Sequence, residues 1–292
     1  MNPHQHTSSS SNIKLAFFLN LFFAIFEIAG SFFTSSLAIL STGLHDLGDT
    51  LSLGTSWFLL NYSQKQRNQK FSYGYRRFSL LGALINSIVI ITGSFFVISE
   101  AVRRIQNPVH SDAQGMILFA IIGITVNLVA ALRVRKGQSI NEKVIVWHLL
   151  DDVFGWAAVL VVAVIIIFRD VHVLDPILSG LVSLYVLWKV LKNFRKTVAI
   201  FLQAVPESIN IKSLEEEMLH IGHIQSIHDT HLWSLDGEYN ILTTHILLSK
   251  KATREDVFVI KCKVKELVQK ENVQHSTIEV EIEGEICKLD GC

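Results

Sequence analysis

Long apolar stretches fill the first two thirds of the chain. Six of them have the length and composition of membrane spans: Ile13–Phe33, Leu37–Leu60, Phe78–Val102, Met116–Leu132, Val144–Phe168 and Val173–Leu191. A bilayer core of about 30 Å needs about 20 such residues per helix. The pattern therefore predicts a polytopic α-helical membrane domain of six transmembrane helices over residues 13–200. The Ser-rich segment 1–12 before it is predicted to be disordered.

After Pro206 the long apolar runs stop and shorter periods replace them. Helices are predicted over Ile211–Ile221 and from the capping residue Thr253 to about Lys270. Strands are predicted over Ile227–Ser234, Tyr239–Leu248 and Thr277–Glu283, the last with alternating apolar and acidic positions. This order predicts a cytoplasmic α+β domain over residues 206–284, compatible with a ferredoxin-like sheet. Residues 285–292 form a Cys-containing C-terminal tail.

Bulk composition supports a membrane protein. Hydrophobic residues make up 50% of the 292 residues and charged residues 18%, and the formal net charge is zero. Nothing in this balance indicates a nucleic-acid partner. The three cysteines, Cys262, Cys287 and Cys292, are an odd number without a framework spacing, which favours reduced thiols or metal ligands over disulfides.

Lys and Arg residues are unevenly shared between the two sides of the predicted membrane domain. One side carries Lys65, Arg67, Lys70, Arg76, Arg77, Arg133, Arg135, Lys136, Lys143, Lys189, Lys192, Arg195 and Lys196; the other has Arg103, Arg104 and Arg169. Because basic loops stay in the cytoplasm, both termini are predicted to be cytoplasmic. No secretory signal is recognisable at the N-terminus, so we expect an integral multi-pass protein of the cell (inner) membrane.

The second and fifth spans each contain ionisable residues at mid-depth. His45 and Asp49 are four residues apart, as are His148 and Asp152, so each pair projects from one face of its helix. Each Asp costs about 2.5–3.5 kcal/mol if it faces lipid, so these side chains must face protein, water or an ion. Two imidazoles and two carboxylates suit tetrahedral coordination of zinc, whereas sites built from oxygen alone favour Mg, Ca or Mn.

A single such pair is equally well explained as a structural hydrogen bond or as half of a proton relay. The repetition of His-x-x-x-Asp on a second span favours a metal site shared by the two helices. Asp46 and Asp151 lie within these two motifs. Three roles are open to them: they orient the ligands through hydrogen bonds, they carry protons, or they line a water-filled cavity.

With these residues the chain resembles the cation diffusion facilitator family, in its zinc-transporting branch. The resemblance extends over nearly the whole chain. It includes the two His-x-x-x-Asp motifs, Glu27, the stretch Phe71-Ser72-Tyr73-Gly74-Tyr75-Arg76-Arg77, Asp175-Pro176, and His228-Asp229-Thr230-His231-Leu232-Trp233.

The resemblance implies proton-coupled zinc efflux by alternating access in a homodimer. It places the transport site at His45, Asp49, His148 and Asp152 and a cytoplasmic metal site at His228, His245 and Glu281. His275, Glu279, Cys287 and Cys292 match the family more loosely. The alternative for His228 and His245 is a purely structural role as half-buried residues of the sheet. Glu27 is a candidate for a proton path or for hydrogen bonding between helices.

The sequence also departs from the family pattern. No histidine lies between spans 2 and 3, where Tyr73 and Tyr75 stand instead, and none lies in the short loop between spans 4 and 5. We therefore expect no metal site in either loop. Asp46 and Asp151 occupy positions where the family usually has small or apolar residues.

Metal ligation needs neutral imidazole and ionised carboxylate, so protons compete with the ion for the same atoms. We therefore expect Zn²⁺/H⁺ antiport rather than enzymatic activity, with Cd²⁺ and Co²⁺ as other possible cargo. Two alternatives come from other classes of protein. An intramembrane zinc hydrolase needs an open coordination position, typically with His-Glu-x-x-His, which is absent. A membrane-anchored metal sensor that does not transport needs no ligands at mid-depth.

Overall fold

The computed structural model describes residues 5–63, 65, 67–134 and 140–284. Contacts between residues divide the chain into two compact units. The first unit combines Met1–Tyr62 with Gly82–Phe194, and the second combines Ser63–Leu81 with Arg195–Cys292. The segment between helices α2 and α3 therefore belongs with the C-terminal part of the chain rather than with the helices that it connects.

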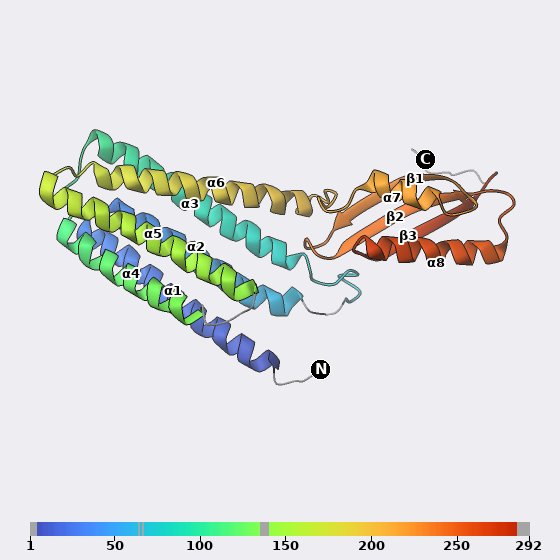
Figure 1. Ribbon diagram of the computed structural model, residues 1–292, viewed down its shortest axis with the longest axis horizontal. Helices are drawn as coiled ribbons and strands as arrows, with labels where there is room; N and C mark the ends of the chain where they lie inside the picture. The colour runs from blue at the N-terminus through green and yellow to red at the C-terminus, as the bar shows by residue number, and fades with distance from the viewer. Residues whose placement is uncertain (1–4, 64, 66, 135–139, 285–292) are drawn as a thin grey trace. The chain divides into compact units, whose positions relative to one another are not determined.

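Six long helices occupy the first two thirds of the chain (Figure 1). They are α1 (Gln5–Thr34), α2 (Leu37–Ser63), α3 (Phe78–Gln106), α4 (Ala113–Val134), α5 (Ile140–Arg169) and α6 (Leu174–Phe201). Each contains the apolar stretch predicted for it, except that α6 starts one residue later, and α6 continues well beyond Leu191. Within the described residues, the helices long and apolar enough to cross a membrane are α1 and α3 to α6, five in all. The chain is thus a multi-pass membrane protein.

The N-terminal segment differs from the prediction of disorder over residues 1–12, because α1 already begins at Gln5. Serine is only a moderately poor helix former, and the apolar span that follows removes the cost of starting a new helix. The proline of this segment, Pro3, precedes the helix and does not interrupt it.

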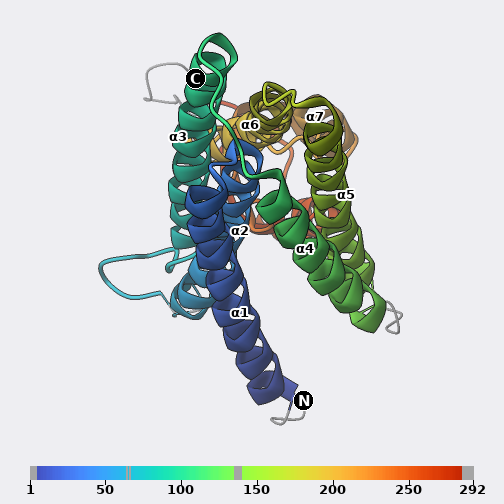
Figure 2. The same ribbon diagram turned by 90° about the vertical axis from the view of Figure 1, so that its left-hand side faces the viewer.

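Helices α4 and α5 lie side by side (Figure 2) and share a core with the start of α2. Trp156 on α5 is 2% exposed and lies against Gly123 on α4. A Cβ atom at Gly123 would lie 2.4 Å from the indole ring. The absence of a side chain at Gly123 therefore allows the two helices to pack around the largest side chain of this core.

The loops 35–36, 107–112 and 170–173 meet at one end of the helical unit, which we call the short-loop end. Asp175, at the start of α6, is fully buried there and binds the start of α2. Its carboxylate accepts hydrogen bonds from the Ser36 hydroxyl (2.6 Å) and from the backbone N–H groups of Leu37 (2.7 Å) and Ala38 (3.1 Å). The Ser111 hydroxyl donates a fourth hydrogen bond at 3.3 Å. Asp175 thus caps α2 from a distant part of the chain and links all three loops.

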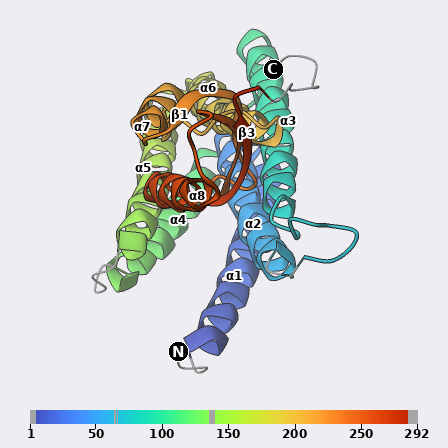
Figure 3. The same ribbon diagram turned by 90° about the vertical axis from the view of Figure 1, so that its right-hand side faces the viewer.

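The second unit contains a three-stranded sheet in the order β1 (Ile224–Ser234), β2 (Asn240–Leu248), β3 (Val273–Ile282). Strands β1 and β2 are antiparallel, whereas β2 and β3 are parallel. Helices α7 (Ile211–Leu219) and α8 (Arg254–Lys270) pack against one face of the sheet around a common apolar core (Figure 3). The predicted small α+β domain is therefore present, and the capping box at Thr253 is confirmed.

The hydrogen bonds that Asp256 accepts from the Thr253 side chain and backbone N–H hold the pKa of that carboxyl below its usual range.

The segment 63–81 contacts the sheet end of this unit through charged and aromatic side chains. Arg76 forms an ion pair with Asp236 at 3.2 Å, and its guanidinium lies 4.6 Å from the centre of the Tyr239 ring. Tyr73 makes an edge-on ring contact with His275. The basic and aromatic stretch of the resemblance is thus a packing element of the C-terminal unit.

The α4–α5 contact gives a stability prediction. We expect Gly123→Ala to destabilise the protein by about 1–3 kcal/mol, because the added methyl group forces the Trp156 ring out of its position. The measurement is thermal unfolding of the purified protein in detergent. Gly155→Ala is the matched control, since a Cβ at Gly155 meets no atom within 4 Å. Equal unfolding temperatures for the two variants would contradict the packing described.

Candidate metal centres

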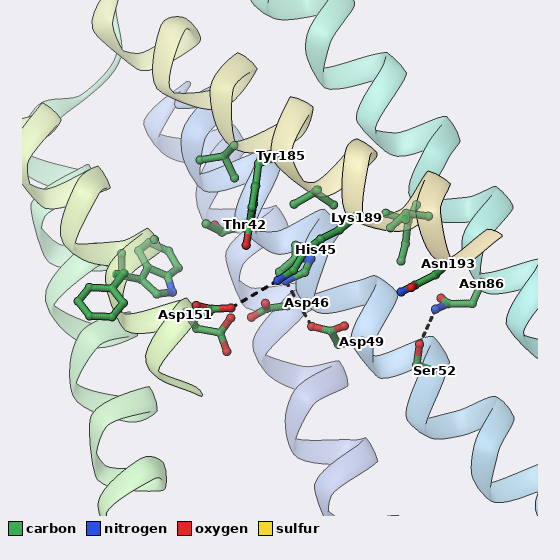
Figure 4. Close-up of a pocket in the computed structure, with 18 of the residues that line it drawn as sticks. Thr42, His45, Asp46, Asp49, Ser52, Asn86, Asp151, Tyr185, Lys189 and Asn193 are labelled. Carbon is green, nitrogen blue, oxygen red and sulfur yellow. Dashed lines mark hydrogen bonds and ion pairs between the residues drawn. The ribbon is translucent and has the colours of Figure 1, made fainter. Parts of the chain in front are cut away.

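A cavity of about 630 Å³ lies within the helical unit (Figure 4). Its charged and polar lining comes from four helices: Thr42, His45, Asp46, Asp49, Ser52, Asn86, Ser87, Asp151, Asp152, Tyr185, Lys189 and Asn193. The ionisable residues of α2 and the two aspartates of α5 therefore surround the same space. An Asn86 side-chain N–H donates to the Ser52 hydroxyl, which ties α3 to α2 at the edge of the cavity.

The α2 pair has the arrangement that its spacing predicts. His45 Nε2 lies 3.5 Å from Asp49 Oδ2, and the two side chains are 32% and 28% exposed. Figure 4 shows His45, Asp46 and Asp49 on two neighbouring turns of α2 at the cavity. An imidazole nitrogen and a carboxylate oxygen are thus held close together at a surface that an ion can reach.

The α5 part of the cavity is formed by Asp151 and Asp152. The Asp151 carboxylate lies 3.4 Å from the ammonium group of Lys189 on α6, and that ammonium is 4.9 Å from the centre of the Tyr185 ring. The side chain of His148 lies outside the described residues, although its backbone belongs to α5. The cavity thus contains His45, Asp49 and Asp152 of the four predicted transport ligands.

Lys189 is a functional candidate that the sequence reasoning missed. It was counted among the basic residues at the cytoplasmic end of span 6, whereas its ammonium group reaches into the cavity beside Asp151. In the sequence Lys189 is followed closely by Lys192 and Lys196, so nothing distinguishes it from the other lysines at this end of the helix. Only the position of its ammonium group, 3.4 Å from the Asp151 carboxylate, separates this lysine from its neighbours.

Glu27 on α1 is fully buried and lies against α2, with its Cβ atom 3.1 Å from the place where a Cβ of Gly43 would be. Asp46 and Asp152 are close enough to act on it electrostatically. A buried acid beside two cavity acids is suited to hold a proton that passes to or from them.

The C-terminal unit brings together the three residues expected to form the cytoplasmic site. His228 and His245 are directly opposite each other on β1 and β2, and their ring centres are 5.4 Å apart. Glu281 Oε1 lies 2.9 Å from His245 Nδ1, and Glu281 Oε2 lies 3.5 Å from His228 Nε2. One ligand atom from each residue lies within 4.8 Å of the others, which is the size of a cradle for a metal ion.

A β-bulge in β1 makes this arrangement possible. The register shifts between His228 and His231, and Asp229 at the bulge has a φ of 49°. Because an extra residue reverses the alternation of side chains, Ile227 and Leu232 both face the apolar core while His228 faces away from it. Aspartate is one of the residues that tolerate this left-handed conformation. No local pattern of residues predicts the bulge.

Two further acids surround the cluster. His245 Nε2 lies 3.7 Å from Asp229 Oδ2 and 3.5 Å from Glu279 Oε2. Glu279 was a looser candidate from the resemblance, and Asp229 was not expected as a ligand. His275 instead contacts Tyr73, and Cys287 and Cys292 lie outside the described residues. His245 is 8% exposed, so the sheet-residue explanation fits its burial but not the carboxylates gathered around it.

Comparison with known proteins decides the family. The sequence profile of the cation efflux transmembrane domain matches residues 13–202, well over half of the chain. The chain belongs to the cation efflux family. This agrees with the resemblance to the zinc-transporting cation diffusion facilitators.

Three relatives show the extent of the similarity. The cadmium, cobalt and zinc/H⁺-K⁺ antiporter of Bacillus subtilis is 29% identical over 287 residues, which cover 96% of this chain and 92% of the relative. The metal cation efflux system protein CzcD of Cupriavidus metallidurans is 27% identical over 284 residues, 96% and 90% of the two chains. The zinc transporter ZitB of Pectobacterium atrosepticum is 28% identical over 296 residues, 99% and 91% of the two chains.

These proteins are transporters, so the chain is a membrane cation-efflux protein and not an enzyme. The hydrolase alternative is therefore wrong. The similarity extends over both units of the chain, which makes the C-terminal unit a regular part of such a transporter rather than an unrelated addition.

Proposed function

We propose that this protein exports Zn²⁺ across the cell membrane in exchange for protons, binding the ion between α2 and α5. The observation that carries the proposal is the single cavity lined by His45 and Asp49 from α2 and by Asp152 from α5. His148 lies one helical turn before Asp152 on α5 and completes the proposed set of four ligands.

Two imidazoles and two carboxylates are a donor set for a borderline divalent ion. Zinc accepts a fixed tetrahedron because it has no geometric preference of its own. Cadmium and cobalt accept the same donors, and the name of the Bacillus subtilis relative includes cadmium, cobalt and zinc. Zn²⁺ is therefore the first cargo that we propose, with Cd²⁺ and Co²⁺ as further ones.

Charge in the cavity explains how release is coupled to protons. Asp46, Asp49, Asp151 and Asp152 give it a strongly acidic lining, which Lys189 offsets in part. A bound ion keeps the ligands deprotonated, and protons arriving from the outer side compete with it for the same atoms. We propose His45 and Glu27 as the residues that accept these protons, since His45 lines the cavity and Glu27 is buried against α2. The Bacillus subtilis relative is likewise named an antiporter for H⁺.

We further propose that α2 is the sixth membrane span. Its polar residues His45, Asp46 and Asp49 lower its hydropathy, but they line the cavity rather than the outer surface. A sixth span between α1 and α3 also keeps the basic connections on one side, so that both termini are cytoplasmic. An inert membrane anchor needs no such acidic cavity, which argues against the sensor alternative.

For the C-terminal unit we propose a regulatory zinc site in a homodimer. Its element order, α7-β1-β2-α8-β3, is that of a ferredoxin-like fold without the first strand, so that β2 and β3 pair directly and in parallel. His228, His245 and Glu281 supply three ligands and leave a position for water or for an acid nearby. Zinc bound there at high cytoplasmic concentration tightens the dimer and promotes export.

The transport site is tested by Asp49→Asn. We expect this change to lower zinc flux at least tenfold, because an amide replaces a charged ligand of the ion. Flux is measured in vesicles reconstituted with purified protein, with an acidic lumen on the release side. Asp112→Asn is the matched control, since Asp112 lies at the short-loop end and asparagine caps α4 as well as aspartate does. Undiminished flux in Asp49→Asn would refute the site.

The cytoplasmic site is tested by His245→Gln. We expect zinc-dependent tightening of the dimer to disappear while residual flux at saturating zinc persists, because the transport ligands are intact. Dimer affinity is measured by fluorescence with and without added zinc. His275→Gln removes an imidazole from the same sheet outside the cluster and should behave like the wild type. A wild-type zinc response in His245→Gln would remove the regulatory proposal without affecting the transport site.

A further inference from the structure

The short-loop end contains a second group of metal-ligating side chains that the transport proposal does not use. His110 comes from loop 107–112, and Asp170 and His172 come from loop 170–173. One ligand atom from each lies within 4.8 Å of the others. All three residues lie outside the candidate membrane spans, which end at Gln106 and Arg169 and begin again at Ala113 and Leu174.

The loops hold these side chains in fixed positions. His172 accepts a hydrogen bond at Nδ1 from the Ser111 backbone N–H (3.2 Å), and its Nε2 lies 3.0 Å from Asp170 Oδ1. Its side chain is only 13% exposed. Asp170 adopts a left-handed φ of 52°, which places its carboxylate beside the ring. The neighbouring Ser111 hydroxyl is bound to Asp175, so the loop that carries His110 is also anchored.

The two imidazoles lie against each other in this arrangement. The ring centres of His110 and His172 are 4.4 Å apart at an angle of 43°. Both rings, with the Asp170 carboxylate, present nitrogen and oxygen donors toward one small volume. His110 and Asp170 are exposed, so an ion from solution can reach them.

We propose that His110, Asp170 and His172 form a zinc site at the short-loop end, with water as the fourth ligand. Two imidazoles, a carboxylate and an open position suit a borderline divalent ion. The inference rests on the proposed function for its orientation, because the basic connections at the other ends of the helices make this the outer side. An ion released from the cavity then meets a second set of ligands before it leaves the protein.

Binding at this site changes the hydrogen bonding of His172. In the structure Nδ1 of His172 accepts a hydrogen bond from the Ser111 N–H, so the ring proton is on Nε2 and points to Asp170. An ion at Nε2 displaces that proton to Nδ1, which then no longer accepts from the Ser111 N–H. Zinc therefore competes with a contact that joins loops 107–112 and 170–173. A site that weakens such a contact binds loosely, as an exit site must.

The test uses the full chain with Asp49→Asn and His245→Gln, which remove one ligand from each of the other two proposed sites. Zinc binding is measured by equilibrium dialysis. We expect one zinc ion per chain, with an affinity that falls at least tenfold in His110→Gln and in Asp170→Asn. Asparagine keeps the left-handed backbone of position 170, so loss of folding does not explain a loss of binding. His220→Gln removes an exposed imidazole from the second unit and should leave the affinity unchanged.

Hydrogen exchange gives an independent reading. Zinc should speed exchange of the Ser111 amide in the background protein and leave it unchanged in His110→Gln. Absence of zinc binding in the background protein, or binding that both variants retain, overturns the inference. Transport is measured separately in wild-type vesicles: absence of zinc flux overturns the proposed function alone, whereas normal flux without binding at the loops overturns only this site.

Discussion

The cost of placing charge in a bilayer governs this structure. Each aspartate at the centre of a span costs about 2.5–3.5 kcal/mol if lipid surrounds it, and α2 and α5 together carry four of them. The fold avoids this cost by directing Asp46, Asp49, Asp151 and Asp152 into one cavity. A concentration of negative charge away from lipid then attracts a divalent cation, and the same charge allows protons to replace it.

The cavity depends on a frame that holds α2 in place. At the short-loop end, Asp175 binds the first backbone N–H groups of α2 and the Ser111 hydroxyl. In the core that α4 and α5 share with the start of α2, Gly123 and Trp156 fix α4 against α5. These contacts set the positions of the two helices that carry the proposed ligands. The Asp175-Pro176 motif entered the sequence analysis only through the family resemblance. In the structure Asp175 caps α2, a helix far from it in the sequence.

Much of the architecture could be predicted because it follows from hydropathy and period. The spans from Leu37 to Phe168 appear where the patterns place them, and so do the elements of the C-terminal unit, except that β1 and β3 begin earlier, at Ile224 and Val273. The His-x-x-x-Asp spacing correctly put His45 beside Asp49. What escaped prediction depends on contacts between distant segments. The role of Lys189 in the cavity, the bulge at Asp229 and the association of segment 63–81 with the C-terminal unit leave no local signal.

The central claim is that ligands from α2 and α5 bind one ion together. X-ray absorption at the zinc edge tests it directly, in full-length protein with His110→Gln, His228→Gln and His245→Gln and one zinc per chain. The account predicts two imidazole nitrogens at about 2.0–2.1 Å and two oxygens, with one imidazole lost in His45→Gln and one in His148→Gln. A shell containing sulfur, or one that neither substitution changes, would contradict it.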